Sequence, residues 1–163
     1  MIFIECNNDF TFFTLLCHPI SKRKFRHFNK PELLKNLDDG DWDTVVGICD
    51  EDNPQSNPRL FPVLDKFEFV EALPGDSAKL FRHRTRRNCF LIMLVPMLEE
   101  WLYHRAKICG IDPSDFKLPR DPKVLHERFR VHDQPKFHEF LQKIIETDAD
   151  IAKLRRWVQI NER

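Results

Sequence analysis

The run Val45-Val46-Gly47-Ile48-Cys49, followed at once by Asp50-Glu51-Asp52, constrains the fold of this chain more than any other stretch. Its residues are apolar on both faces of a strand, which is typical of a central strand in a parallel sheet. The N-terminal run Ile2-Phe3-Ile4-Glu5 has the same character, and Asp9 follows it. In open α/β sheets, ligands bind at the carboxyl edge of the strands. Carboxylates that follow two such strands therefore predict a site at that edge.

The rest of the chain alternates strands and helices as far as about residue 110 and then continues with helices alone. This pattern predicts an α/β fold, with a small parallel sheet, helices on both faces and a helical C-terminal extension. Residues 2–5, 44–49 and 90–95 are expected to be neighbouring parallel strands. The full expectation is strands at 2–5, 24–28, 44–49 and 90–95, and helices at 9–17, 29–37, 59–68, 97–108, 122–130, 135–147 and 149–158.

The length of 163 residues favours one globular domain, with residues 1–96 as an α/β core and residues 97–163 as a helical extension packed on it. Acidic and basic residues balance at 26 each, so the net charge neither favours nor excludes nucleic acid. The N-terminus lacks the basic start of a secretory signal, and the longest apolar run is too short to span a bilayer. The five cysteines form no Cys-x-x-Cys pair. We therefore expect a cytoplasmic protein without membrane contact.

The order of the acidic motifs resembles the Toprim domain. This is the metal-binding catalytic module of topoisomerases, bacterial primases, small ribosomal-RNA maturases and nucleases of the overcoming-lysogenisation-defect type. In that family one strand ends in Glu-Gly-x-x-Asp and a later strand ends in Asp-x-Asp. Here the motifs are Glu5-Cys6-Asn7-Asn8-Asp9 and Asp50-Glu51-Asp52, with Cys6 at the usual glycine position. The resemblance covers roughly residues 1–96.

The resemblance implies a Toprim-like fold, a cofactor and a set of roles. Glu5 would act as general base or acid, while Asp50 and Asp52 would hold Mg²⁺ or Mn²⁺. Asp9 would belong to the same metal site. Glu99, in a Leu-Glu-x-x-Leu helix start, looks like the residue that joins the metal site in nuclease-like members of the family. Carboxylate oxygens are also, by their chemistry alone, suitable ligands for a hard divalent cation.

Each of these acids has an ordinary structural explanation as well. Asp9 can cap a helix, and Glu99 can interact favourably with the dipole of the helix that it begins. Residues 50–52 can form an acidic turn at a strand end. The order of the two motifs along the chain, rather than either motif alone, favours the metal site.

Two basic stretches are candidates for binding a phosphate backbone. The first is Lys22-Arg23-Lys24, and the second contains Arg82, Arg84, Arg86 and Arg87. The second directly precedes the last expected strand, which suggests a cationic edge beside the metal site. Solvated loops of a charge-rich protein have the same composition.

The predicted function is a Mg²⁺-dependent nuclease that cleaves DNA or RNA, alone or as the effector of a two-component system with an ATPase. The alternative is a Toprim-like binding or regulatory subunit without catalysis, which Cys6 and the neutral charge leave open. A phosphohydrolase that uses Asp50 as nucleophile fits less well. Pro54 stands where the haloacid-dehalogenase pattern requires Thr.

Overall fold

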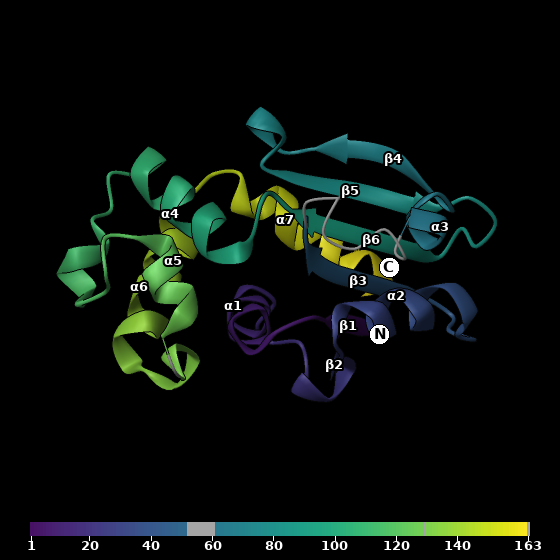
Figure 1. Ribbon diagram of the computed structural model, residues 1–163, viewed down its shortest axis with the longest axis horizontal. Helices are drawn as coiled ribbons and strands as arrows, with labels where there is room; N and C mark the ends of the chain where they lie inside the picture. Colours follow the sequence, from purple (N-terminus) through teal and green to yellow (C-terminus); the bar gives the residue numbers. More distant parts are fainter. Residues whose placement is uncertain (52–60, 129, 163) are drawn as a thin grey trace.

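The computed structural model describes residues 1–51, 61–128 and 130–162, which form an α/β fold with additional C-terminal helices (Figure 1). The strands are β1 (Ile2–Ile4), β2 (Phe25–His27), β3 (Val45–Asp50), β4 (Phe67–Ala72), β5 (Ala78–His83) and β6 (Cys89–Leu94). The helices are α1 (Asn7–Leu16), α2 (Lys30–Asp39), α3 (Phe61–Leu64), α4 (Leu98–Ile108), α5 (Pro122–Glu127), α6 (Pro135–Thr147) and α7 (Ile151–Val158). Among the described residues, no helix combines the length and the apolar character needed to cross a membrane.

The six strands form one sheet in the order β2-β1-β3-β6-β5-β4. β1 runs parallel to both β2 and β3, and β3 runs parallel to β6 with Asp50 opposite Leu94. The prediction that residues 2–5, 44–49 and 90–95 form neighbouring parallel strands is confirmed. The carboxyl ends of β1, β3 and β6 consequently lie along one edge of the sheet.

The sheet is mixed, so the predicted parallel sheet accounts for only its β2-β1-β3-β6 part. β5 pairs antiparallel with both β6 and β4. Within the described residues the helix expected at 59–68 is limited to α3, and residues 67–72 form β4. Charged residues at Lys79 and Arg82 interrupt the apolar positions of β5. They give this strand the composition of a solvated loop, which weakens the period-two pattern that identifies a strand.

Helices cover both faces of the sheet, as predicted. On one face α1, α4, α6 and α7 share a buried cluster with Ile4 and Ile48. On the other face α2 and α3 pack on a second cluster that contains Phe3. At Gly47 the helix α2 comes so close to β3 that an added Cβ would lie 2.4 Å from Cδ1 of Leu37. The two apolar faces of β3 are thus both covered, which explains its continuous apolar run.

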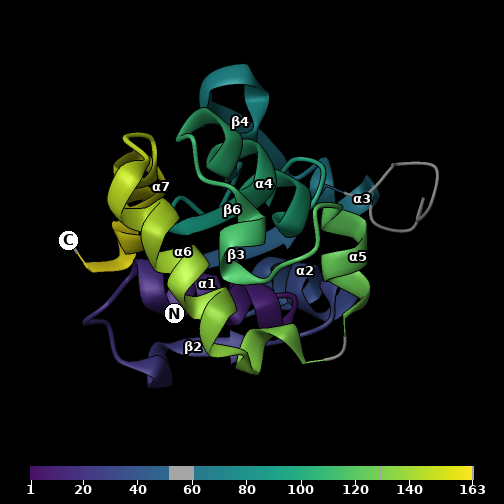
Figure 2. The ribbon, with the colours of Figure 1, turned by 90° about the vertical axis from the view of Figure 1, so that its left-hand side faces the viewer.

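The C-terminal helices extend the first of these clusters. α6 has the expected bounds, whereas α5 ends at Glu127 instead of residue 130 and α7 begins at Ile151 instead of residue 149. Phe140 and Trp157 are buried in the same cluster as the sheet residues. Figure 2 shows the left-hand side of Figure 1, with α4, α5 and α6 in front of the sheet. These helices therefore lie beside the carboxyl ends of the parallel strands.

Candidate functional site

Glu5 and Asp50 lie side by side at the carboxyl edge of the sheet. β1 and β3 pair with Ile4 opposite Ile48, which brings the residues after the two strands together. Oε2 of Glu5 accepts a hydrogen bond from the backbone N–H of Asp50 at 3.2 Å. The structure therefore brings the first acid of one motif against the first acid of the other. Asp52, which was predicted to share this site, lies outside the described residues.

Asp50 also connects the strands to the neighbouring helices. Its Oδ1 accepts a hydrogen bond from the backbone N–H of Leu98, the first residue of α4, at 2.8 Å. Its backbone carbonyl accepts a hydrogen bond from the ammonium group of Lys30, in the first turn of α2. A helix N-terminus carries partial positive charge, so α4 stabilises the ionised form of Asp50. Asp50 is consequently held by two helices as well as by Glu5.

Asp9 is fully buried and takes part in a capping box. One of its carboxylate oxygens accepts a hydrogen bond from the N–H of Cys6 at 3.2 Å, and Sγ of Cys6 accepts one from the N–H of Asp9 at 3.4 Å. The N-cap of α1 is therefore Cys6, and Asp9, the expected cap, instead contributes from the third position of the helix as the second member of the capping box. Cys6 has a φ of −132°, an extended value that any residue adopts. This position does not require the glycine of the Toprim pattern.

The second oxygen of Asp9, Oδ1, is buried and has no hydrogen-bond partner among the described residues. A buried acceptor without a partner costs free energy, on the order of 1–3 kcal/mol and more when it is charged. Such an atom indicates a place where a proton or a cation would be stabilising.

Glu99 lies in the first turn of α4 and is 1% exposed. Its Oε1 accepts a hydrogen bond from the side-chain amide of Asn8 at 2.7 Å. Its Oε2 lies 3.1 Å from Nδ1 of His126, a residue of α5 whose side chain is 50% exposed. These two contacts join α1, α4 and α5. An interaction with the helix dipole does not require such deep burial, so Glu99 is more than an exposed first-turn acid.

Burial and mutual repulsion both act on the ionisation of these acids. Burial, followed by the charge of Asp50, raises the pKa of Asp9 well above its usual range. Burial, followed by the charges of Glu5 and Glu99, raises the pKa of Asp50 to about 7, although the charge of Lys30 opposes this shift. Ionising these acids together is therefore costly, and a bound cation would reduce that cost.

The raised pKa of Asp50 predicts how stability depends on pH when no metal is bound. A carboxyl group with a higher pKa in the folded state binds its proton more tightly when folded. The folded state therefore loses stability as the pH rises from about 4 to about 7. Asp50→Asn removes this titration and keeps an oxygen that can accept the hydrogen bond from Leu98. At about pH 8 the variant is expected to exceed the wild type in free energy of unfolding by on the order of 1–3 kcal/mol.

Urea denaturation of both proteins with a chelator, at about pH 5 and pH 8, measures this difference. The advantage of Asp50→Asn should be smaller at the lower pH, where wild-type Asp50 is protonated. An advantage that does not change with pH would contradict the proposed cost of ionising Asp50.

The described residues suit a hard divalent cation in their chemistry but do not form a complete metal site. Carboxylate oxygens are the ligands that Mg²⁺ prefers, and Oδ1 of Asp9 is a buried acceptor that needs a partner. Within the described ranges, no group of three His, Cys, Asp or Glu side chains is placed to hold a metal ion. The described residues therefore suit a cation by the type of their donor atoms and by their charge, but not by the number of ligands that they bring together.

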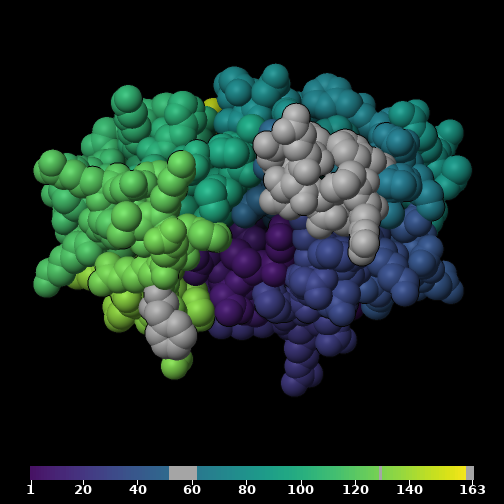
Figure 3. Space-filling view, in the orientation of Figure 1, coloured from purple at the N-terminus to yellow at the C-terminus, as the bar shows by residue number. Residues whose placement is uncertain are grey.

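One face of the molecule is hollowed beside the N-terminal residues. In Figure 3 the molecule is hollowed where the purple N-terminal residues lie, between the green helical extension and the blue segment that contains α2. Asp9 and Glu99 are themselves buried, at 0% and 1% exposure, so they lie beneath the surface.

The basic stretches lie at the opposite edge of the sheet. β5 runs antiparallel to β6, with Ala78 opposite Leu94, so residues 84–87 follow the end of β5 that is far from the carboxylates. The separation along a six-residue strand is roughly 20 Å. Residues 22–24 precede β2, which is parallel to β1, so they lie at the far edge too. The expectation that these stretches flank the acidic site is wrong.

Three arginines of the second stretch are engaged within the fold. Arg82 pairs with Glu68 at 2.8 Å, and Arg84 donates a hydrogen bond to the carbonyl of Asp65 at 3.1 Å. Arg86 donates hydrogen bonds to the carbonyls at the C-terminus of α2, those of Leu37, Asp38 and Gly40. A guanidinium at this point satisfies carbonyls that a helix end leaves without partners. Arg86 therefore stabilises the fold.

Sequence reasoning missed three residues that the structure places at the acidic edge: Lys30, Asn8 and His126. Lys30 carries a recognisable signal, because a lysine in the first turn of a helix opposes the helix dipole and so suggests a tertiary role. It is only 5% exposed. Asn8 and His126 carry no such signal, since their contacts with Glu99 cross 91 and 27 positions of the chain.

Comparisons with known protein families, with curated proteins and with solved structures find no match to this chain.

Proposed function

We propose that this chain is a Mg²⁺-dependent nuclease of Toprim type that cleaves phosphodiester bonds in DNA or RNA. The observation that carries the proposal is the contact between Glu5 and Asp50, the leading acids of the two motifs, on neighbouring parallel strands. The unpartnered oxygen of Asp9 and the raised pKa of Asp50 support it. Both indicate acids whose ionised forms a cation would stabilise.

In this proposal Asp50, Asp52 and Asp9 hold the ion, and Mg²⁺ or Mn²⁺ supplies charge stabilisation to the phosphoryl oxygens when it is bound. Glu5 accepts a proton from the attacking nucleophile, or donates one to the leaving oxygen. The N–H of Asp50 fixes the position of one Glu5 oxygen. Glu99 has both oxygens engaged, by Asn8 and His126, and adds its charge beside the ion.

Lys30 has two roles in the proposed site. It fixes the end of β3 by donating a hydrogen bond to the carbonyl of Asp50. Its charge also reduces the repulsion among the acids, because it lowers the pKa of Asp50 against the effects of burial and Glu5. The proposed site therefore keeps its carboxylates close together before a cation binds.

Mg²⁺ or Mn²⁺ is expected to raise the melting temperature of the wild-type protein. An ion that binds only the folded state stabilises it by about 2.7 kcal/mol at a hundredfold excess over its Kd. For a protein of this size the shift is roughly 5–10 °C. Thermal melts at matched ionic strength, with sodium chloride as control, test this, and Asp50→Asn should respond less. If neither Mg²⁺ nor Mn²⁺ changes the melting temperature of a well-folded wild type, the alternative hypothesis of a non-catalytic Toprim-like subunit is favoured.

Cleavage itself is tested with labelled single-stranded and double-stranded DNA and RNA, with and without Mg²⁺ or Mn²⁺. An ATPase encoded beside this chain is the partner to add, because the predicted two-component arrangement would make cleavage depend on it. Metal-dependent products from any of these substrates support the proposal. The absence of products from all of them, with the partner present, contradicts it.

A further inference from the structure

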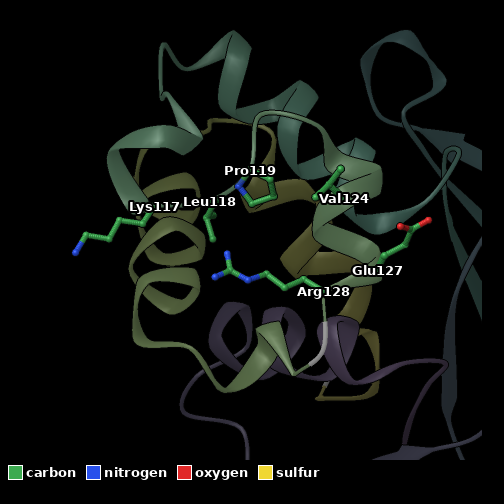
Figure 4. Close-up of a pocket in the computed structure, with 6 residues that line it drawn as sticks. All are labelled: Lys117, Leu118, Pro119, Val124, Glu127 and Arg128. Carbon is green, nitrogen blue, oxygen red and sulfur yellow. The ribbon is translucent and has the colours of Figure 1, made fainter.

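A surface pocket of about 580 Å³ lies on the helical extension, between residues 117–119 and α5 (Figure 4). Its lining consists of Lys117, Leu118, Pro119, Val124, Glu127 and Arg128. Pockets of about 300–1,000 Å³ typically hold small organic ligands. The volume is therefore sufficient for one nucleotide unit.

The helix α5 lies between this pocket and the acidic edge. His126 contacts Glu99 from α5, whereas Val124 of α5 and Arg128, the residue that follows the helix, line the pocket. His126 is two residues from Val124 in the same helix and so points to a different side of it. A helix with its side chains is about 10 Å across, a distance that a nucleic-acid strand spans in a few nucleotides.

The rim of the pocket is anchored to the helix that carries Glu99. Oη of Tyr103 donates a hydrogen bond to the carbonyl of Pro119 at 2.5 Å. Tyr103 lies four residues after Glu99 on α4, so the two side chains are on the same face of that helix. The pocket and the acidic edge therefore hold a fixed relative position.

The charges of the pocket favour an anion. The side chains of Lys117 and Arg128 are exposed, and in the described part of the chain neither makes a hydrogen bond or ion pair. With Glu127 as the one acid, the three charged lining residues carry a net charge of 2 − 1 = +1. In Figure 4 the guanidinium of Arg128 and the carboxylate of Glu127 point in opposite directions. Arg128 extends toward Leu118, away from the acid.

The remaining lining residues form an apolar wall. Leu118, Pro119 and Val124 supply it, and Val124 is 51% exposed. An unstacked base packs on the flat face of a guanidinium and, in pockets that take a flipped-out base, on apolar side chains. A base in a duplex is stacked and paired, so it cannot enter such a pocket. The combination of cations and an apolar wall thus matches an unpaired nucleotide.

We infer that this pocket binds an unpaired nucleotide of a single-stranded nucleic acid that crosses α5 to reach the acidic edge. Lys117 and Arg128 contact the phosphates, and the base packs on Leu118, Pro119 and Val124. The inference rests on the proposed function, which requires a nucleic-acid substrate. It assigns substrate binding to the helical extension instead of the basic stretches at the far edge of the sheet.

The test measures binding rather than cleavage. Fluorescence anisotropy follows labelled oligothymidylate and oligouridylate on the wild-type protein in chelator, so that no substrate is cut. The double variant Lys117→Ala, Arg128→Ala should bind roughly tenfold more weakly at low salt. Its slope of log affinity against log salt should fall by about 1.4, the value for two lost phosphate contacts on a single strand.

Two control variants make the same change of charge elsewhere. Lys143→Ala with Arg156→Ala removes two exposed cations from α6 and α7 and should leave binding unchanged. Arg84→Ala with Arg87→Ala tests the far edge directly and should weaken binding less than the pocket variant. If Arg84→Ala with Arg87→Ala lost as much affinity as the pocket variant, or more, the inference would be overturned. Binding of a duplex as tight as that of the single strand would also overturn it.

The same experiment separates this inference from the proposed function. If binding depends on the pocket cations but the wild type with Mg²⁺ cleaves nothing, the inference holds and the nuclease proposal fails. If the wild type cleaves nucleic acid while Lys117→Ala, Arg128→Ala binds normally, the inference alone fails. An oligothymidylate with abasic sites should bind more weakly than the intact strand, and equal binding would exclude the base contact.

Discussion

Glu5→Gln is expected to lower metal-dependent cleavage by about 10²–10⁴-fold, the usual contribution of a general acid or base. The substitution removes a proton acceptor but changes little volume. Its amide oxygen can still accept the hydrogen bond that Oε2 of Glu5 receives from the N–H of Asp50. The fold should therefore be intact, and the loss should appear in kcat. Single-turnover cleavage at saturating Mg²⁺ measures it.

A matched control is Glu139→Gln, which makes the same chemical change on an exposed position of α6. Its cleavage rate should equal that of the wild type. Equal residual cleavage by wild type and Glu5→Gln would mean that the observed activity does not belong to this site. Excess Mg²⁺ should not rescue Glu5→Gln, whereas it should partly rescue Asp50→Asn, because Asp50 is proposed to act through metal affinity.

Arg105→Met is expected to cause a large loss of stability. Arg105 of α4 and Asp148, between α6 and α7, form a buried pair with both side chains 2% exposed. Arg105 also contacts Asp150 at 2.6 Å. Removal of one partner leaves a buried charge without compensation, which costs about 3–5 kcal/mol. For a protein of this size the melting temperature should fall by roughly 10 °C.

The double variant Arg105→Met, Asp148→Leu tests whether the uncompensated charge of Asp148 causes this loss of stability. Without the buried carboxylate the penalty disappears, so the double variant should recover a large part of the lost stability. Lys136→Met is the control, because its pair with Glu139 is about half-exposed and should contribute less than about 1 kcal/mol. A double variant that is less stable than Arg105→Met would show that the pair itself, and not the unpaired charge, provides the stability.

The same pair connects the fold to the proposed site. Arg105 lies on α4, the helix whose first N–H holds Asp50 and whose first turn carries Glu99. Loosening the contact of α4 with α6 and α7 should therefore also reduce the metal-induced shift in melting temperature. This makes the helical extension a support for the acidic edge as well as part of the core.

The sequence by itself was enough to predict the centre of the fold. Residues 2–5, 44–49 and 90–95 were identified because a strand covered on both faces needs a continuous apolar run. The helix at 135–147 was found with its bounds because its apolar residues recur with helical spacing. The contact of Glu5 with Asp50 followed from the same reasoning, since parallel neighbours end at one edge. These features depend on short-range patterns and on the geometry of parallel strands.

Only the tertiary structure decided the rest. β4 and β5 were missed because strands near an edge of the sheet carry charges that resemble those of a loop. The direction of β5 then placed Arg84 and its neighbours at the far edge, which the order of residues along the chain does not reveal. The contacts of Glu99 with Asn8 and His126 depend on which helices pack side by side. Local periodicity encodes the faces of a helix or strand, but the partner of each face is selected by packing of the whole chain.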